Sequence, residues 1–289
     1  MEEKTLTASE KAALTTLLDD PSPAVRQALL AHFGRAGSAA SEFLHSVSVG
    51  RSHPAAEAAR TYLRELKLSD PVSDFRNFIT SLNYELESGF ILLNRTQNPS
   101  LDVAAVRTQL DTLAARFQKL RPLGRGLRSQ CLLLNQVLFS EFGLHGNHEH
   151  YSDPLNMFLD QVLDRRTGLP ISLAIVYLLV AQRAGLELEP VGAPGHFLVG
   201  AYEPEGPFFI DAFNGGQLLE PDEVFARLKA MHHSPQLGDL APTPVREVLT
   251  RCCRNLAHHY AVAQDHEHAR IYAGFVADFE AVHERSAQP

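Results

Sequence analysis

Apolar residues recur at intervals of three and four along most of the chain, a spacing that predicts a protein built mainly of helices. The clearest seam runs over residues 103–120, where the apolar positions step by 3, 4, 3, 4 and 3 from Val103 to Leu120. The same rule predicts a helix over residues 75–90 and another over residues 127–142, ending before Gly143. Because each of these helices has one apolar face, we expect them to pack around a shared core.

A different pattern covers residues 170–184, which are apolar all round. Pro170 suits the first position of a helix, and Gly185 is a suitable stop. A helix without a polar face must be buried, so we expect this one at the centre of its domain.

After this central helix the period changes to that of strands. Residues 189–202 and 207–213 are short runs rich in β-forming residues, and Glu203 to Gly206 predict a hairpin turn between them. The predicted fold class is therefore α+β, predominantly helical, with a small antiparallel sheet.

The two ends of the chain resemble helical repeats. Val25-Arg26 with Leu29 recurs 34 positions later as Ala59-Arg60 with Leu63, a spacing typical of helical hairpins, and the preceding stretch resembles a HEAT repeat. Residues 245–282 resemble one tetratricopeptide unit, broken near Asp265. We predict four segments: 1–70, HEAT-like hairpins; 71–126, helices that pack on the core; 127–235, the core; and 240–289, a tetratricopeptide-like helix pair.

Composition narrows the classes of function. The net charge of −8 and the lack of a basic stripe argue against a nucleic-acid partner. The most apolar run, Leu169 to Ala181, is shorter than the about 20 residues that a membrane span needs. Residues 1–11 are polar and do not form a signal peptide, and the three cysteines form no disulfide framework. We expect a cytoplasmic protein without a cofactor.

The candidate chemistry lies in the predicted core. Gly168 to Pro170 begin the buried helix, whose dipole would favour a thiolate at that end. His196 and Asp211 are fifteen residues apart on the two expected strands, where they could meet side by side. A histidine base oriented by a carboxylate serves nucleophilic hydrolases of the papain type. Taken alone, the spacing favours a half-buried structural histidine beside a turn-forming aspartate.

Residues 132–219 resemble the transglutaminase-like superfamily, and within it the SirB1-like branch. The matching segments are Tyr151–Asn156, Val162–Leu173, Val191–Val199 and Ile210–Leu218. The resemblance implies Gly-x-Cys at the start of the buried helix, an alanine four residues after the cysteine and a glycine fifteen after it. Without gaps, Gly168, Ala174 and Gly185 take these positions, and Pro170 takes that of the cysteine.

The resemblance also implies that His196 is the base and Asp211 its orienting acid. The first hypothesis is accordingly a protein that has lost thiol catalysis and acts as a scaffold or regulator, binding a protein or peptide partner. Its cleft would be lined by the pair and four further residues: Asn156, Arg166, Ser172 and Asn214. In the third hypothesis, the helical ends bind the partner and the core only fills space.

The second hypothesis is a peptide or amide hydrolase, or an acyl transferase, with Ser172 as nucleophile. Ser172 lies two residues beyond Pro170, which turns its side chain by about 200° at roughly 100° per residue. It could replace the cysteine only if the helix began two residues later. Otherwise its hydroxyl would bond free backbone groups of the first helical turn.

Other reactive side chains have less support. Cys131 lies among leucines and is expected to be an inert core residue, and Cys252 and Cys253 lie in the tail helices. Two histidine clusters lack cysteine or carboxylate ligands at a known metal-binding spacing, so we expect them on the surface and predict no metal site. They are His145, His148 and His150, and His258, His259, His266 and His268.

Overall fold

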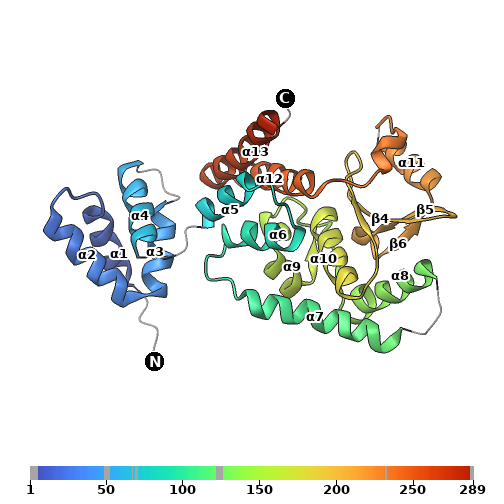
Figure 1. Cartoon of the computed structure of the whole chain (residues 1–289), viewed down its shortest axis with the longest axis horizontal. Coiled ribbons are helices and arrows are strands. Elements are labelled where there is room, and N and C mark those ends of the chain that lie inside the picture. Colours follow the sequence, from blue (N-terminus) through green and yellow to red (C-terminus); the bar gives the residue numbers. More distant parts are fainter. Residues whose placement is uncertain are drawn as a thin grey trace. The chain divides into compact units, whose positions relative to one another are not determined.

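The computed structural model describes residues 6–48, 53–66, 68, 71–121, 126–231 and 233–286. The chain divides into two compact units (Figure 1). The first comprises Met1–Asn83, Leu92–Leu101 and Asp265–Pro289, and the second comprises Tyr84–Ile91 and Asp102–Gln264. Each unit is described by itself.

The first unit begins with four helices that share one core. They are α1 (Ala8–Leu17), α2 (Pro23–Ala36), α3 (Ser38–Ser48) and α4 (His53–Glu65). Leu29 and Leu63, the equivalent positions of the predicted repeat, are both buried in this core together with Phe33 and Phe43. A HEAT-like arrangement of these helices stays a prediction.

Aromatic packing joins two helices of the first unit that are distant in sequence, α5 (Pro71–Thr80) and α13 (His266–Ser286). The ring of Phe75 lies 4.8 Å from that of Phe275, centroid to centroid, and 6.1 Å from that of Phe279. Beside these rings, Arg76 Nε is 3.1 Å from Asp278 Oδ2.

The single helix predicted over residues 75–90 was wrong, because the chain breaks at Leu82, which has a left-handed φ of 58°. A second helix, α6 (Leu86–Arg95), then begins where the Glu85 carboxylate accepts hydrogen bonds from the backbone N–H groups of Glu87 and Ser88. By capping the start of α6, the Glu85 side chain stabilises the break between the two helices. The sequence did not reveal this break, because the apolar residues keep their helical spacing across it.

Helices dominate the second unit. They are α7 (Val103–Leu120), α8 (Leu127–Asn135), which continues as the π-helix η1 (Gln136–Glu141), α9 (Leu159–Arg165), α10 (Pro170–Arg183), α11 (Pro221–Ala230) and α12 (Val245–Val262). Three short 3₁₀-helices, η2 (Pro154–Met157), η3 (Ala212–Asn214) and η4 (Leu237–Leu240), connect them. The predicted helix over 103–120 is confirmed at both ends.

The buried central helix is also confirmed. It begins at Pro170, and Gly185, with φ of 72°, follows its end. Every residue from Pro170 to Ala181 is buried. In Figure 1, α10 lies between α9 and the sheet, and it packs against α7, α9 and β4. Its burial explains why no face of this helix is polar.

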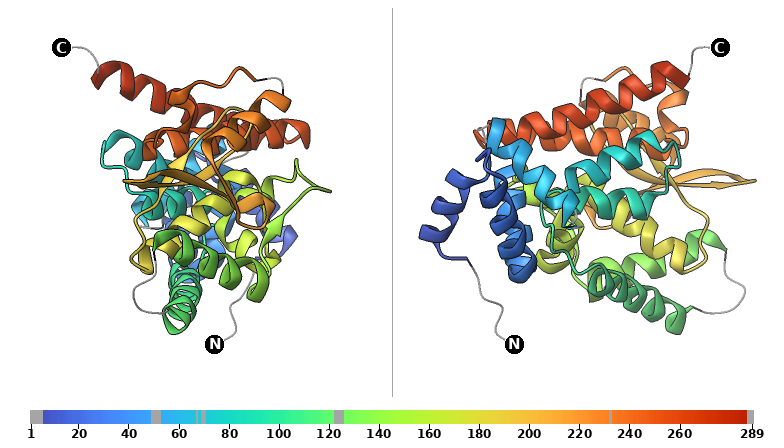
Figure 2. Two further views of the ribbon diagram at one scale, coloured as in Figure 1. Left: turned by 90° about the vertical axis from the view of Figure 1, so that its right-hand side faces the viewer. Right: turned by 60° about the vertical axis from the view of Figure 1, so that its left-hand side comes forward.

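Four antiparallel strands form the sheet, in the order β3 (Glu189–Val191), β4 (Leu198–Glu203), β5 (Gly206–Asp211) and β6 (Gln217–Leu219). The predicted hairpin is confirmed as β4–β5, drawn in gold in the further views of Figure 2. The run predicted over 189–202 instead splits into two strands around a turn at residues 192–197. A parallel pair, β1 (His145–Gly146) with β2 (Thr167–Gly168), was not predicted.

The C-terminal helix pair predicted from the pattern is present as α12 and α13. The chain breaks between them at Gln264, which has φ of 62°. Their tetratricopeptide-like packing stays a prediction. Within the described ranges, no helix is long and apolar enough to cross a membrane.

Candidate functional site

The register of the β4–β5 hairpin brings His196 to Asp211. Asp211 is the last residue of β5, and His196 lies in the 192–197 turn just before β4, rather than on a strand as the sequence suggested. Val199 pairs with Ile210, so the end of β5 faces the residues that lead into β4. His196 Nε2 is 2.9 Å from Asp211 Oδ1. The two atoms are close, but their contact lacks the alignment of a hydrogen bond.

Asp211 is held from several sides and only 1% of its side chain is exposed. The backbone N–H of Asn214 donates to Oδ1 at 3.2 Å, and the Asn214 amide donates to Oδ2 at 2.8 Å. Arg227 Nη1 donates to the same Oδ2 at 3.3 Å. Burial alone would raise the pKa of Asp211, but the contact with His196 and the Asn214 bonds outweigh it and lower the pKa below its ordinary value. Asp211 is therefore a carboxylate at neutral pH.

The start of α10 lies in the same part of the second unit. α10 packs against η3, which follows Asp211 directly. On the other side, Gly146 pairs with Gly168, two residues before Pro170. A Cβ at Gly146 would lie 2.7 Å from both the ring and the carbonyl oxygen of Phe213. The ring of Phe213 lies 6.3 Å from that of His196. Pro170 itself is buried and offers no nucleophilic atom.

Ser172 is enclosed at the start of α10. Its side chain is 0% exposed. The hydroxyl donates to the carbonyl oxygen of Asn156 at 2.6 Å and accepts from the backbone N–H of Leu169 at 2.9 Å. Since α10 begins at Pro170, Ser172 has the rotation that turns its side chain away from that of Pro170, the residue that the resemblance puts at the cysteine position. Of the two roles considered for this serine, nucleophile and partner of backbone groups in the first helical turn, the geometry favours the second.

Two further residues predicted to line the cleft, Asn156 and Arg166, are, like Ser172, not among those that line the cavity described below. Asn156 is 0% exposed, and its amide holds the loop before η2 by donating to His150 O at 2.7 Å and accepting from Asn147 Nδ2 at 2.9 Å. Arg166 is exposed at the end of α9, with φ of 57°, and its guanidinium lies 5.2 Å from the centre of the Phe142 ring. From the sequence alone, a polar residue near the motif that belongs to a buried hydrogen-bond network looks the same as one that lines a cleft.

A cavity of about 260 Å³ opens beside the pair. Its polar end is formed by His196, Asp211, Asn214 and Arg227. The other walls are apolar: Leu198, Leu219, Val224, Leu228, Ala230 and Met231. Met231 is 43% exposed, whereas the leucines are almost completely buried. The cavity thus joins an apolar interior to a hydrogen-bonding end, the usual composition of a ligand pocket.

Sequence reasoning missed two arginines at this site. Arg227 on α11 bridges Asp211 Oδ2 and Gln217 Oε1, the latter at 2.8 Å. Arg251 on α12 donates to the backbone carbonyl of His196 at 2.9 Å. Both look like ordinary surface charges of amphipathic helices, and no motif links them to residues so distant in sequence.

The thiols are enclosed in the core. Cys131 is 0% exposed, and burial raises its pKa to about 12. Burial also raises the pKa of Cys252, which is 0% exposed like its neighbour Cys253. A thiol that resists ionisation is a poor nucleophile, so these environments are those of structural cysteines.

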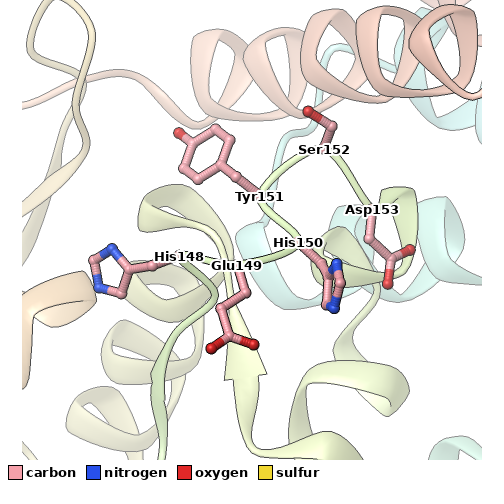
Figure 3. A pocket seen from close by; sticks show the side chains of 6 residues that line it. All are labelled: His148, Glu149, His150, Tyr151, Ser152 and Asp153. Atoms are coloured by element: carbon pink, nitrogen blue, oxygen red, sulfur yellow. The ribbon is translucent and has the colours of Figure 1, made fainter.

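Two histidines of the first cluster, His148 and His150, border an open hollow of about 510 Å³ lined by residues 148–153, whereas His145 lies on β1. In Figure 3, the side chains of His148 and His150 point in different directions. Asp153, in the same hollow, is paired with Arg165 at 2.7 Å. In the described part of the chain, no three histidine, cysteine, aspartate or glutamate side chains are grouped to hold a metal ion.

The second cluster is dispersed between two helices. On α12, the rings of His258 and His259 meet edge to face with centroids 5.5 Å apart, and His259 is buried. His266 begins α13, where His268 Nδ1 lies 2.8 Å from Asp265 Oδ2. The same aspartate caps the helix, because its Oδ1 accepts the backbone N–H of His268 at 3.1 Å.

Comparisons with known proteins give relatives of two kinds. The chain is 35% identical over 189 residues to a UPF0162 protein of Xylella fastidiosa, covering 61% of this chain and 65% of that protein. It is 31% identical over 225 residues to F-box only protein 21 of Homo sapiens, covering 68% of this chain and 35% of the relative. The mouse F-box only protein 21 is 42% identical over 139 residues, which are 45% of this chain and 22% of the relative. The chain therefore spans less than two thirds of the length of these curated relatives.

No solved structure gives a significant match. The family model described as the transglutaminase-like superfamily matches residues 104–254. This match begins in α7 and ends in α12, and it includes the start of α10, His196 and Asp211. Since it covers more than half of the chain, the protein belongs to the transglutaminase-like superfamily.

Proposed function

We propose that this protein binds a peptide segment of a partner protein in the cavity beside His196 and Asp211, without thiol catalysis. One observation carries the proposal. The histidine and the carboxylate are in contact at the end of an apolar cavity, and Pro170, which the resemblance puts at the cysteine position, is buried. A site that keeps its shape and loses its nucleophile retains the ability to recognise a ligand.

The walls of the cavity indicate the chemistry of that ligand. A volume of about 260 Å³ lined by leucine and valine side chains suits one large apolar side chain. At the polar end, Asn214 uses its amide nitrogen for Asp211, and its Oδ1 accepts no hydrogen bond from the described residues. Arg227 is 39% exposed and has further N–H groups to donate. These groups match a peptide backbone, which offers an N–H and a C=O beside every side chain.

The peptide is expected to be uncharged at the anchoring position. Asp211 already faces His196 and Arg227, so the polar end carries no isolated charge that would select an ion. An apolar anchor with backbone hydrogen bonds is a common way to recognise an extended peptide.

The comparisons support a module that works beside other protein segments. The matched region makes up 35% of the human F-box only protein 21, so related sequence occurs inside a longer protein. A scaffold or regulatory role follows as a proposal. The finer assignments that accompany it are the SirB1-like branch, the four-segment division, the tetratricopeptide-like tail and a cytoplasmic location, and each stays a prediction.

Peptide or amide hydrolysis by Ser172 is the second candidate. The contact between His196 and Asp211 favours it, because that contact would orient a base. It requires the Ser172 hydroxyl to leave its bonds to Asn156 and Leu169 and the first turn of α10 to rearrange.

The first experiment separates these candidates. Purified wild type is treated with a fluorophosphonate and with iodoacetamide beside Ser172→Ala, Cys131→Ala and His196→Ala, and labelling is read by intact mass and peptide mapping. We expect no site-specific labelling under native conditions. Labelling of Ser172 or Cys131 that disappears in His196→Ala would replace the binding proposal with the enzyme.

The second experiment tests binding directly. Peptides are selected from a random display library on the wild-type protein, and their affinities are measured by calorimetry. Met231→Lys, at the exposed rim of the cavity, should weaken binding about tenfold, equivalent to ~1.4 kcal/mol. Leu237→Lys is the matched control, since Leu237 is 82% exposed and does not line the cavity. Failure to enrich any peptide, or equal loss in both variants, would contradict the proposal.

A further inference from the structure

We infer that Arg251 is a positioning residue, which holds the 192–197 turn in the conformation that places His196 against Asp211. The inference rests on the proposed function in one respect: His196 lines the proposed ligand cavity, so its position would affect ligand binding. The claim that Arg251 on α12 sets the orientation of His196 can be tested without any ligand.

The guanidinium group of Arg251 spans the turn. Nη1 donates to the carbonyl oxygen of Ala193 at 3.0 Å, and Nη2 donates to the carbonyl oxygen of His196 at 2.9 Å. The same group lies 5.4 Å from the centre of the Phe197 ring, the next residue along the chain. The planar fork of an arginine can make both hydrogen bonds and stack on an aromatic ring at once, which a lysine ammonium cannot do.

The charge of Arg251 has no carboxylate partner among the described residues. Burial lowers the pKa of Arg251, which shows that its surroundings disfavour the cation. A partly buried cation that is satisfied by carbonyl oxygens and an aromatic face contributes little by charge pairing. Its contacts all converge on one turn, so its contribution is to the geometry of that turn.

The start of the turn is held by the segment that precedes α12. Thr243 Oγ1 accepts the backbone N–H of Gly192 at 2.8 Å, and the Thr243 N–H donates to Pro190 O at 2.8 Å. A Cβ at Gly192 would lie 3.2 Å from Arg251 Nη1 and 3.2 Å from Thr243 Oγ1. The glycine therefore allows the arginine and the threonine to approach the backbone together.

A second glycine, Gly195, allows a tight turn directly before His196. Gly195 has φ of 70°, and a Cβ there would lie 2.6 Å from His233 Nε2. With both glycines packed and two carbonyls bonded to Arg251, the backbone that carries His196 has little freedom. The residues 192–197 need this bracing because no strand partner is present over that stretch.

The test follows the His196 ring directly. Protein with ¹⁵N-labelled histidine is prepared as wild type, Arg251→Met, Arg251→Lys and Arg246→Met, and His196→Ala assigns the resonances. Arg246 is the matched control, since it lies on the same helix and pairs with Glu247 at 3.1 Å. In Arg251→Met we expect the two ring nitrogens of His196 to move toward the averaged values of a free histidine. Arg251→Lys should give a smaller change in the same direction, and Arg246→Met none.

Peptide affinity provides the second readout. Arg251→Met should bind a selected peptide about tenfold more weakly, an effect of ~1.4 kcal/mol, and Arg251→Lys should lie between it and wild type. If the His196 signals change and wild type binds no peptide, the positioning role stands and the proposed function fails. Unchanged His196 signals in a folded Arg251→Met protein would overturn the positioning role, whatever the peptides do.

Should Arg251→Met not fold, two milder variants carry the test. Arg251→Lys keeps the charge and length of the side chain, and Gly192→Ala introduces a methyl group against Arg251 and Thr243. Both must shift the His196 ring resonances if the bracing is real, and an unchanged spectrum in both would refute it.

Discussion

The start of α10 and the cavity beside Asp211 both gather polar groups inside the second unit, but they satisfy them differently. At the start of α10, the Ser172 hydroxyl is 0% exposed and bonds to backbone groups on both sides. At the cavity, Asn214 and Arg227 hold Asp211 and still have hydrogen-bonding capacity beside an apolar interior. Saturated polar groups stabilise a fold, whereas partly used groups next to an apolar cavity leave a place for a ligand.

The largest effect is expected from Asp211→Ala, which would remove the carboxylate that organises the cavity. His196, Arg227 and Asn214 would then face a buried gap, and the free energy of unfolding should fall by about 3–5 kcal/mol. Urea unfolding measures this. The control is Asp222→Ala on the exposed first turn of α11, expected within about 1 kcal/mol of wild type. Equal losses in the two variants would mean that Asp211 is a surface-like carboxylate.

Ser172→Ala tests the other side of the comparison. It would leave the Leu169 N–H and the Asn156 carbonyl without their partner in the core, and should cost about 2 kcal/mol in unfolding free energy. The exposed Ser140→Ala should change stability by less than about 0.5 kcal/mol. A serine that could be removed without loss of stability would not have the structural role that its bonds indicate.

The pH dependence of stability sharpens the part played by Asp211. Because its pKa in the folded protein is lowered, its ionised form stabilises the fold at pH values above the ordinary pKa of 3.8. That contribution disappears as the pH falls through the lowered pKa. The difference in unfolding free energy between wild type and Asp211→Asn should therefore be constant near neutral pH and shrink in acid. A difference that grew on acidification would show that the pKa is raised instead.

The smallest effect is expected from Arg227→Met. The guanidinium is 39% exposed, so solvent screens its pairing with Asp211, and the stability loss should be about 1 kcal/mol or less. Lys229→Met, an exposed position on the same helix, is the control. Peptide binding should suffer more than stability in Arg227→Met, and a loss of stability without a loss of binding would remove Arg227 from the ligand site.

Local patterns were sufficient for the elements that are defined by their own residues. The apolar run between Pro170 and Gly185 predicted α10, and two runs rich in β-forming residues joined by Glu203 to Gly206 predicted the β4–β5 hairpin. The spacing of His196 and Asp211 allowed a contact between them, and the register of the hairpin produces it although His196 lies in the turn before β4. Their role in recognition is a separate question that the spacing does not answer.

Features that depend on distant partners were not predictable. The 192–197 turn interrupts a continuous β-rich pattern because Thr243 and Arg251, about fifty residues later, bond to its backbone. Asn156 was assigned to the cleft because nothing in the sequence pattern indicates that its amide is used in a buried hydrogen-bond network. The break at Leu82 was missed because the apolar residues keep their helical spacing on both sides of it.

Proline at the start of α10 has a consequence beyond the missing thiol. In acyl-transfer enzymes, the backbone N–H of the nucleophilic residue often helps to bind the negative oxygen of the tetrahedral intermediate. Proline has no N–H, and the N–H of the preceding Leu169 is already bonded to Ser172. If Pro170 takes the cysteine position, as the resemblance implies, this one residue would remove both the attacking atom and an oxyanion donor. Conversely, Pro170→Cys would supply both groups in one step, in a protein whose His196 and Asp211 are already in contact.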